Sequence, residues 1–391
     1  MSPFLSADGE KFRGEARAFI EQRYPTNLRE KREGDVLSKQ DYLAWHRILA
    51  VKGWIAPAWP EEYGGANWSL ERRYIWQDEL ARADTISLPP MGIGMLGPVI
   101  YTFGTSVQKD QFLAPTLAGD IFWCQGYSEP QAGSDLASVS MKAVRVGDRY
   151  VVTGQKMWTS LAQYADWIFC LVRTDPDSQK QAGISFLLID MRSPGIAIKP
   201  IQTLGGDLLV NEVWFDEVDV PVANRINDEN RGWACAKFLL GLERTGIANV
   251  ARSKRKLVKL KETARQCADG DQSIFEDHQF REKLAEVEIA LTALEYSELR
   301  IFAEEASGGQ SGASASLLKV RGTEIQQRLA ELFAEAAGYA GCPAAAGNLH
   351  GANAQGRYRA FENYFSSRRT SIYGGTNEVQ RNIMAKAVLG F

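Results

Sequence analysis

Two short segments carry the side chains best suited to chemistry. The first, Tyr127-Ser-Glu-Pro-Gln-Ala-Gly-Ser-Asp135, has the composition of a loop, and its small residues let a ligand approach the backbone closely. The second, Gly154-Gln-Lys-Met-Trp-Thr-Ser160, ends a strand pattern with an indole and two hydroxyls. A flat redox ring needs such an aromatic plane and donors at its polar edge. Taken alone, each segment is more typical of an ordinary turn and a core tryptophan.

Three stretches of different periodicity would position these segments. Residues 1–120 show mostly helical spacing, residues 121–230 contain runs of strand length, and residues 231–391 return to helical spacing. Helices, then strands, then helices predict an α+β chain with an N-terminal helical domain, a middle β barrel or sandwich and a C-terminal helical domain.

Individual elements follow from the same patterns. Residues 142–146 and 149–153 flank the turn dipeptide Gly147-Asp148 and predict a hairpin. Further strands are expected at 167–172, 184–189, 213–215 and 218–220, and helices at 233–266, 277–307, 315–338 and 377–389.

Two motif-like signals have plainer interpretations. Gly92-Ile-Gly94-Met-Leu-Gly97 matches a dinucleotide-binding pattern, but Pro89-Pro90 precede it where a strand is required, so a packed helix start is expected. A basic run, Arg252, Lys254, Arg255, Lys256, Lys259 and Lys261, predicts the solvated face of a long helix.

Composition excludes several classes of protein. The 391 residues are 45% hydrophobic and 24% charged, with a net charge of −3, which argues against disorder and against bulk nucleic-acid binding. No apolar run is long enough for a transmembrane helix, and no secretory signal is visible. Five scattered cysteines and three scattered histidines suggest neither disulfides nor a metal site, so a cytoplasmic location is expected.

Together the motifs are specific, and the chain resembles the acyl-CoA dehydrogenase family from end to end. The matching pieces, in the family's order and spacing, are Glu62-Tyr-Gly-Gly65, the two segments above and Tyr373-Gly-Gly-Thr-Asn-Glu-Val-Gln-Arg381. Within the family, Ala165-Asp-Trp-Ile-Phe-Cys170 and Glu243-Arg-Thr-Gly-Ile-Ala248 are most similar to the pimeloyl-CoA dehydrogenase large-subunit type.

The resemblance implies a C-terminal four-helix bundle, with FAD between the β domain and that bundle. Carried over position by position, the cofactor-binding residues are Gln125, Tyr127, Ser128, Ser134, Trp158, Ser160, Thr376 and Glu378. The acyl-CoA substrate would lie against Ser134, Arg244, Tyr373 and Gly374. A helix that begins after Gly374-Gly375 presents free N–H groups, which suits this placement.

The implied reaction removes a proton from the α carbon of the acyl-CoA while a hydride leaves the β carbon for flavin N5. Many members carry the base as a glutamate directly after the tyrosine of the last motif, where this chain has Gly374. Other members, such as the isovaleryl-CoA and long-chain types, carry it on the first bundle helix, and Leu242-Glu-Arg244 matches that position.

Glu243 is therefore the expected catalytic base. Leu239, Glu243, Ile247 and Val250 recur at helical spacing, which puts the carboxylate on an apolar stripe, and desolvation would raise its pKa towards neutral pH. The alternative is a partly exposed glutamate paired with a lysine or arginine.

A partner chain is also expected. In the family, a neighbouring subunit usually helps to bind FAD with two elements, an Arg-x-x-Phe-Gly loop and a glutamine before Gly-Gly. Here the loop is Ala268-Asp-Gly-Asp-Gln272, with neither the arginine nor the phenylalanine. Glu335 replaces the glutamine, and Tyr339 replaces the second glycine. An α2β2 heterotetramer with a smaller homologous subunit is predicted, the alternative being a homo-oligomer with a divergent loop. Electrons would pass to an electron-transferring flavoprotein. The competing functions are a half-site or non-catalytic subunit and non-dehydrogenase flavin chemistry.

Overall fold

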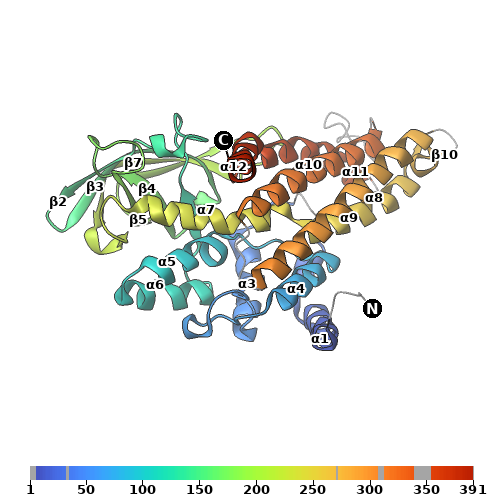
Figure 1. Cartoon of the computed structure of the whole chain (residues 1–391), viewed down its shortest axis with the longest axis horizontal. Coiled ribbons are helices and arrows are strands. Elements are labelled where there is room, and N and C mark those ends of the chain that lie inside the picture. Colours follow the sequence, from blue (N-terminus) through green and yellow to red (C-terminus); the bar gives the residue numbers. More distant parts are fainter. Residues whose placement is uncertain (1–5, 32–34, 270–271, 307–311, 339–353, 391) are drawn as a thin grey trace.

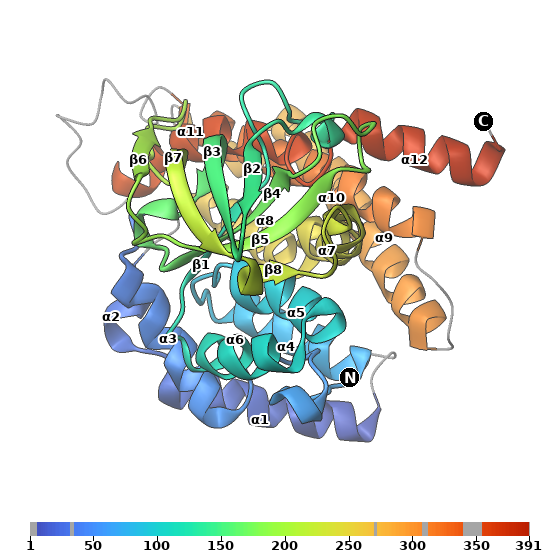
Figure 2. The same ribbon diagram turned by 90° about the vertical axis from the view of Figure 1, so that its left-hand side faces the viewer.

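A computed structural model describes residues 6–31, 35–269, 272–306, 312–338 and 354–390. Helices, a mixed sheet and further helices follow one another along the chain, which confirms the predicted α+β organisation (Figure 1). The N-terminal helices lie along one side of both the sheet and the C-terminal helices (Figure 2).

Four of the described N-terminal helices begin with a side-chain cap. Ser38 and Asp41 form a reciprocal capping box at one helix, and Thr105 and Gln108 form another, so free backbone N–H groups are satisfied at both starts. The N-terminal helices are α1 (Ala7–Arg23), α2 (Thr26–Arg29), α3 (Lys39–Lys52), α4 (Leu70–Arg82), α5 (Gly97–Phe103) and α6 (Ser106–Ala118).

The glycine pattern at residues 92–97 is a packed helix start, as predicted. Met91–Leu96 form a π-helical turn that leads directly into α5. A Cβ atom on Gly97 would lie 1.8 Å from the ring of the buried Trp59, so this glycine permits helix packing.

Eight strands form one mixed sheet in the order β6-β7-β3-β2-β4-β5-β8, with β1 added beside β4. The predicted hairpin is confirmed, with Lys142 opposite Thr153 and Val146 opposite Arg149. The strands are β1 (Trp123–Gly126), β2 (Lys142–Val146), β3 (Arg149–Ser160), β4 (Trp167–Arg173), β5 (Ile184–Asp190), β6 (Ile196–Ile201), β7 (Val210–Pro221) and β8 (Arg225–Ile226).

The sheet encloses a core of its own. Cys170 of β4 and Leu187 of β5 share one buried cluster with Val152 of β3 and Phe215 of β7, so the two halves of the sheet face each other as in a barrel or sandwich. The opposite face of β4 and β5, with Phe169 among its residues, joins the core of the N-terminal helices.

The C-terminal helices differ from the prediction in two places. The helix expected over 233–266 is divided at Asn249, which has a left-handed φ of 53°. A further helix, α11, precedes the closing helix and was not predicted. The C-terminal helices are α7 (Gly232–Ala248), α8 (Val250–Gln266), α9 (His278–Ala306), α10 (Gly312–Ala337), α11 (Ala354–Ser367) and α12 (Asn377–Leu389), and β9 (Ala268–Asp269) and β10 (Gln272–Ser273) form a short hairpin before α9.

The basic run on α8 is not a solvated face, so that prediction is wrong. Arg255 and Lys259 both contact Asp84 at 2.7 Å, and Lys254 contacts Asp78 at 3.1 Å. Asp78 lies on α4 and Asp84 just after it, so the run joins the bundle to the N-terminal domain.

Candidate active site

The two predicted segments of the β domain meet. The backbone N–H of Met157 donates to the carbonyl of Ser128 at 2.9 Å, which joins the loop after β1 to the end of β3. The next residue, Trp158, has φ 62° and a side chain that is 57% exposed. A left-handed backbone is costly for an aromatic residue, by about 1–3 kcal/mol, and such strain is concentrated at functional sites.

A buried ion pair, which sequence reasoning missed, holds these segments in place. Lys156 Nζ lies 2.8 Å from Glu129 Oε1, and both side chains are almost completely buried. Lys156 also donates to the carbonyls of Tyr127 and Leu171. Glu129 Oε1 also accepts the N–H of Met141, and Oε2 accepts the N–H of Ser140.

Every hydrogen-bonding group of this pair is thus used inside the fold. Burial on its own would raise the pKa of Glu129, but the field of Lys156 and these hydrogen bonds lower it below its ordinary value. One signal for this pair was available in the sequence, because the first motif contains the carboxylate of Glu129 and the second contains the ammonium of Lys156.

The two segments carry polar groups of the kind that a flavin would need. Thr159 is buried beside the exposed indole, and its hydroxyl has no hydrogen-bond partner in the described part of the chain. Tyr127 is buried, whereas Gln125, Ser128 and Ser160 are partly exposed and Ser134 is exposed on the loop. A flat, polar-edged ring requires an aromatic plane and reachable polar groups, and these two segments supply both.

The second part of the predicted site is the turn before α12. Gly374 and Gly375 have left-handed φ values of 65° and 79°, and Thr376 caps α12 by accepting from the N–H of Val379. Gln380 Nε2 donates to the carbonyl of Gly374 at 3.0 Å. These bonds give the turn one conformation.

The side chains on this turn are accessible. Tyr373 is 47% exposed and Glu378 is exposed on the first turn of α12. Its own backbone N–H and the Thr376 hydroxyl lower the pKa of Glu378, so its carboxylate is kept ionised.

The segment leading to this turn is fixed to both neighbouring parts of the molecule. On one side, the Gln327 amide of α10 donates to the Thr370 hydroxyl at 3.3 Å and the Ser371 hydroxyl at 3.1 Å. On the other side, Asp207 in the β6–β7 loop lies 3.7 Å from Arg369 and accepts from Ser366. The β domain is therefore connected directly to the segment that precedes the last motif.

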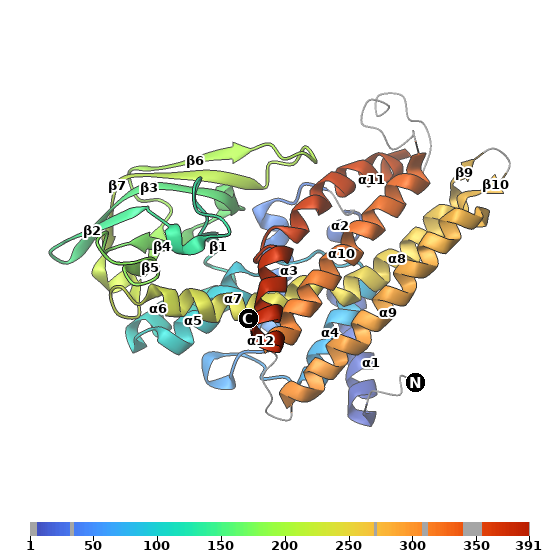
Figure 3. The ribbon, with the colours of Figure 1, turned by 45° about the horizontal axis from the view of Figure 1, so that its top comes forward.

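Glu243 and Arg244 lie near the C-terminal end of α7, but the structure does not describe their side chains. Their helix is well anchored, because Gln326 Nε2 of α10 donates to the carbonyl of Ile247 at 2.9 Å. A Cβ atom on Gly322 would lie 2.6 Å from the Ala248 backbone, so the two helices approach closely there. Figure 3 shows α7, α10 and α12 converging in this region.

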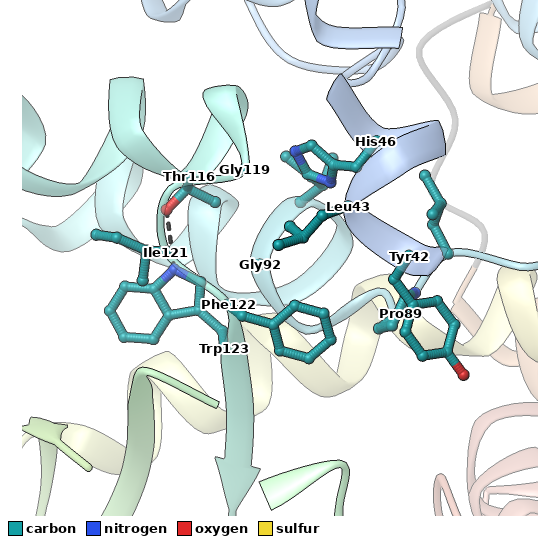
Figure 4. A pocket seen from close by; sticks show the side chains of 12 residues that line it. Tyr42, Leu43, His46, Pro89, Gly92, Thr116, Gly119, Ile121, Phe122 and Trp123 are labelled. Atoms are coloured by element: carbon teal, nitrogen blue, oxygen red, sulfur yellow. Dashed lines mark hydrogen bonds between the residues drawn. The ribbon is translucent and has the colours of Figure 1, made fainter. Parts of the chain in front are cut away.

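A small cavity lies elsewhere, between the N-terminal helices and β1 (Figure 4). It holds about 30 Å³ and is lined in part by Tyr42, His46 and Trp123. The Trp123 indole donates to Thr116 at 2.9 Å, and burial lowers the pKa of His46, which favours a neutral imidazole. This volume suits water and is too small for an acyl chain.

The described residues contain no group of three His, Cys, Asp or Glu side chains that could hold a metal ion. None of the described helices is long and apolar enough to cross a membrane.

Models of one family match successive parts of the chain. The acyl-CoA dehydrogenase N-terminal domain matches residues 6–120, the middle domain residues 124–218 and the C-terminal domain residues 230–389. In Mycobacterium tuberculosis, "Acyl-CoA dehydrogenase IpdE1" is 36% identical over 89% of this chain and 87% of that protein. FadE26 from the same organism is 36% identical over 86% of this chain and 85% of that protein.

Solved structures agree with these relatives. The ChsE4-ChsE5 complex from M. tuberculosis contains a chain that is 34% identical, with a TM-score of 0.84 over 100% of this chain and 99% of that one. A steroid ACAD, Tcur3481-Tcur3483, gives a TM-score of 0.85 at 30% identity, over 100% of this chain and 99% of that one. The pimeloyl-CoA type is not decided by these similarities and stays a prediction. The family resemblance is confirmed: the chain belongs to the acyl-CoA dehydrogenase family, whose members are FAD-dependent oxidoreductases that act on acyl-CoA thioesters.

Proposed function

We propose that the protein converts an acyl-CoA to its 2,3-enoyl-CoA with Glu243 as the base. The observation that carries this proposal is that α10 holds both the end of α7, which bears Glu243, and the segment that leads to Gly374. The carboxylate takes the α proton, and the electron pair left on the α carbon forms the double bond as a hydride departs from the β carbon. Bound FAD would supply the hydride acceptor.

The other residues of this chain would bind and orient. We assign Trp158, Ser160, Gln125, Tyr127, Ser128, Ser134, Thr376 and Glu378 to the cofactor, and Ser134, Arg244, Tyr373 and Gly374 to the substrate. The Gly374 N–H would donate to the thioester oxygen and stabilise the negative charge that forms there. We keep 1–120, 121–230 and 231–391 as the proposed domain bounds.

The environment of α7 supports Glu243 as a base. Leu239, one turn earlier, and Val250, just beyond the helix, are both buried. At Gly374 there is no side chain to compete for the proton, and a substituent is absent where a bulky acyl group would need room. A large, steroid-like acyl group is our proposed substrate class, which the likeness to a steroid ACAD supports.

Replacing Glu243 by glutamine tests the mechanism. The variant should keep FAD but reduce it about 10²–10⁴-fold more slowly under anaerobic conditions, because the α proton has no acceptor. Glu262→Gln, an exposed glutamate on α8, is the matched control and should leave the rate unchanged. Near-normal reduction by Glu243→Gln would show that another group is the base.

We further propose a heteromer with a smaller homologous subunit and an electron-transferring flavoprotein as acceptor. Two structural neighbours support a heteromer, since ChsE4-ChsE5 is a complex and Tcur3481-Tcur3483 names two components. In this chain Glu335 accepts from Lys283 at 2.7 Å, so its charge is partly offset, and residues 270–271 and 339 lie outside the described residues.

Native mass measurement after co-expression with a homologous dehydrogenase gene tests the assembly. An α2β2 species is expected, since two copies of each chain can form a closed assembly, and resemblance to heteromeric relatives implies about two FAD. An active homotetramer with FAD in every chain would contradict it. The alternatives are a non-catalytic subunit and other flavin chemistry. A protein that retains flavin but turns over no acyl-CoA when an artificial electron acceptor is supplied would favour these alternatives.

A further inference from the structure

A lysine is buried beneath the turn that precedes α12. Lys319 of α10 has no exposed surface, and its ammonium donates to Asn377 Oδ1 at 2.9 Å. No carboxylate of the described side chains lies within ion-pair distance of it. A buried ammonium with a neutral acceptor is costly, because the lost hydration is not replaced by an opposite charge.

The acceptor is the first residue of α12. Asn377 Nδ2 donates to Thr323 Oγ1 at 3.2 Å, and the Thr323 hydroxyl donates to the carbonyl of Val320. Asn377 is 5% exposed and Thr323 is fully buried. This chain of hydrogen bonds fixes the first turn of α12 to one place on α10.

Gln380 continues the same arrangement one turn later. It is 1% exposed, and its amide donates to the carbonyls of Gly374 and Gly375. The two glycines have left-handed backbones, which are flexible when unsupported. Lys319, Asn377 and Gln380 together therefore hold the turn from which Gly374, Thr376 and Glu378 project.

The charge of Lys319 also interacts with the first turn of α12. Glu378 is the charged group whose field favours the ammonium, and it lies on the exposed side of the same helix turn. Desolvation outweighs that field and lowers the pKa of Lys319 to about 8. The fold keeps a cation at a position where an apolar side chain would be more stable.

We propose that Lys319 is a positioning residue, which holds the first turn of α12 through Asn377 in the conformation that receives the flavin and the thioester. The proposal rests on the function proposed above for that turn.

The test is Lys319→Met in the full chain, in the assembly in which it purifies. We expect the dissociation constant of FAD to rise at least tenfold and the amides of residues 374–380 to exchange hydrogen at least tenfold faster. The thermal midpoint of the FAD-free protein should stay equal or rise, because methionine fills the site without a charge. Lys386→Met, at an exposed position near the end of α12, should change none of these quantities.

Asn377→Asp is the conservative companion variant. It keeps an acceptor oxygen for Lys319, so FAD affinity should remain within about threefold of the parent, as for a retained hydrogen bond. A loss of more than tenfold would contradict the role of this bond.

Two results would overturn the proposal. One is a folded Lys319→Met protein with FAD affinity and amide exchange within twofold of the parent. The other is a Lys319→Met protein that cannot fold or has a clearly lower thermal midpoint, since that would show a purely structural role. Both readouts are taken without substrate, so inactivity of the parent protein would contradict the proposed function and leave this test intact.

Discussion

Two fully buried lysines lie behind the two parts of the proposed site, and they are held in opposite ways. Lys156 in the β domain faces the carboxylate of Glu129 at 2.8 Å and two carbonyls. Lys319 in the bundle faces the neutral amide of Asn377. The first cation is fully compensated, and the second is not. We infer that the β-domain part is a rigid platform, whereas the turn before α12 is held at a cost in stability.

Breaking the compensated pair should have the largest effect. Lys156→Met would leave Glu129 buried without its cation, which costs about 3–5 kcal/mol of unfolding free energy. The loop at Ser128 and the strand end at Trp158 should loosen together, so FAD should also be lost. Urea unfolding and flavin absorbance measure both effects.

Lys142→Met, on the exposed side of β2, is the matched control and should be neutral. A Lys156→Met protein with parental stability would mean that Glu129 takes up a proton without penalty. The comparison between the two lysines would then fail.

Because Lys319 has no compensating opposite charge among the described side chains, the free energy of unfolding should depend on pH. Burial lowers the pKa of Lys319 from 10.5 to about 8, so in the folded protein the charged form costs about 3 kcal/mol below pH 8. Between pH 8 and 10.5 the folded protein has released the proton and the unfolded chain still binds it, so this cost fades as pH rises. Lys319→Met should therefore be more stable than the parent at pH 7, by an amount that shrinks towards pH 10.

Urea unfolding of both proteins at several pH values measures this difference. A difference that is independent of pH would show that Lys319 is not the titrating group. Glu378, whose field favours the ammonium from the exposed side of α12, is ionised throughout this range because its pKa is lowered.

The turn that Lys319 holds can be disturbed directly at Gly375. Its φ of 79° disfavours any Cβ atom, and a Cβ there would lie 2.5 Å from Gln380 Nε2. Gly375→Ala should cost about 1–2 kcal/mol and displace Gln380 from the Gly374 carbonyl. Thermal unfolding and FAD titration measure the two effects.

Gly14→Ala provides a control of opposite sign. Gly14 lies inside α1 with open space around it, so alanine should stabilise the protein by about 0.5–1 kcal/mol. Equal effects at both positions would mean that the turn is not constrained by Gln380.

The elements were more predictable than the contacts between them. The closing helix 377–389 and the hairpin at 142–153 are confirmed, because periodicity and turn chemistry are local signals. The break at Asn249 was missed, since the apolar pattern continues through this residue of left-handed φ, next to the place where α7 packs closely on Gly322 of α10.

Among the site residues, too, individual positions were easier to predict than the contacts between them. Motif residues such as Trp158 and Thr376 could be placed by resemblance, but nothing in their spacing indicates that Lys156 meets Glu129 or that Lys319 meets Asn377. These partners are 27 and 58 residues apart and meet only when separate elements pack. The charges of α8 were misjudged for the same reason, because Asp84 comes from another domain.

The contacts of Asp84 provide the smallest expected effect and a reference for both lysines. Arg255 and Lys259 face this carboxylate at 2.7 Å, but all three side chains are about one-third exposed. Solvent weakens such pairs, so Asp84→Asn should cost about 0.5–1 kcal/mol and less at high salt.

The contribution of Asp84 to the free energy of unfolding should change with pH in one direction. Burial opposes ionisation of Asp84, but the two cations prevail and lower its pKa, so the contribution is present above the usual pKa of 3.8 and fades as pH falls through the lowered value. Unfolding in urea at 0.05 and 0.5 M salt, about a threefold change in Debye length, measures the effect. If Asp84→Asn cost as much as Lys156→Met, burial would not be what separates the strong pairs of this protein from the weak ones.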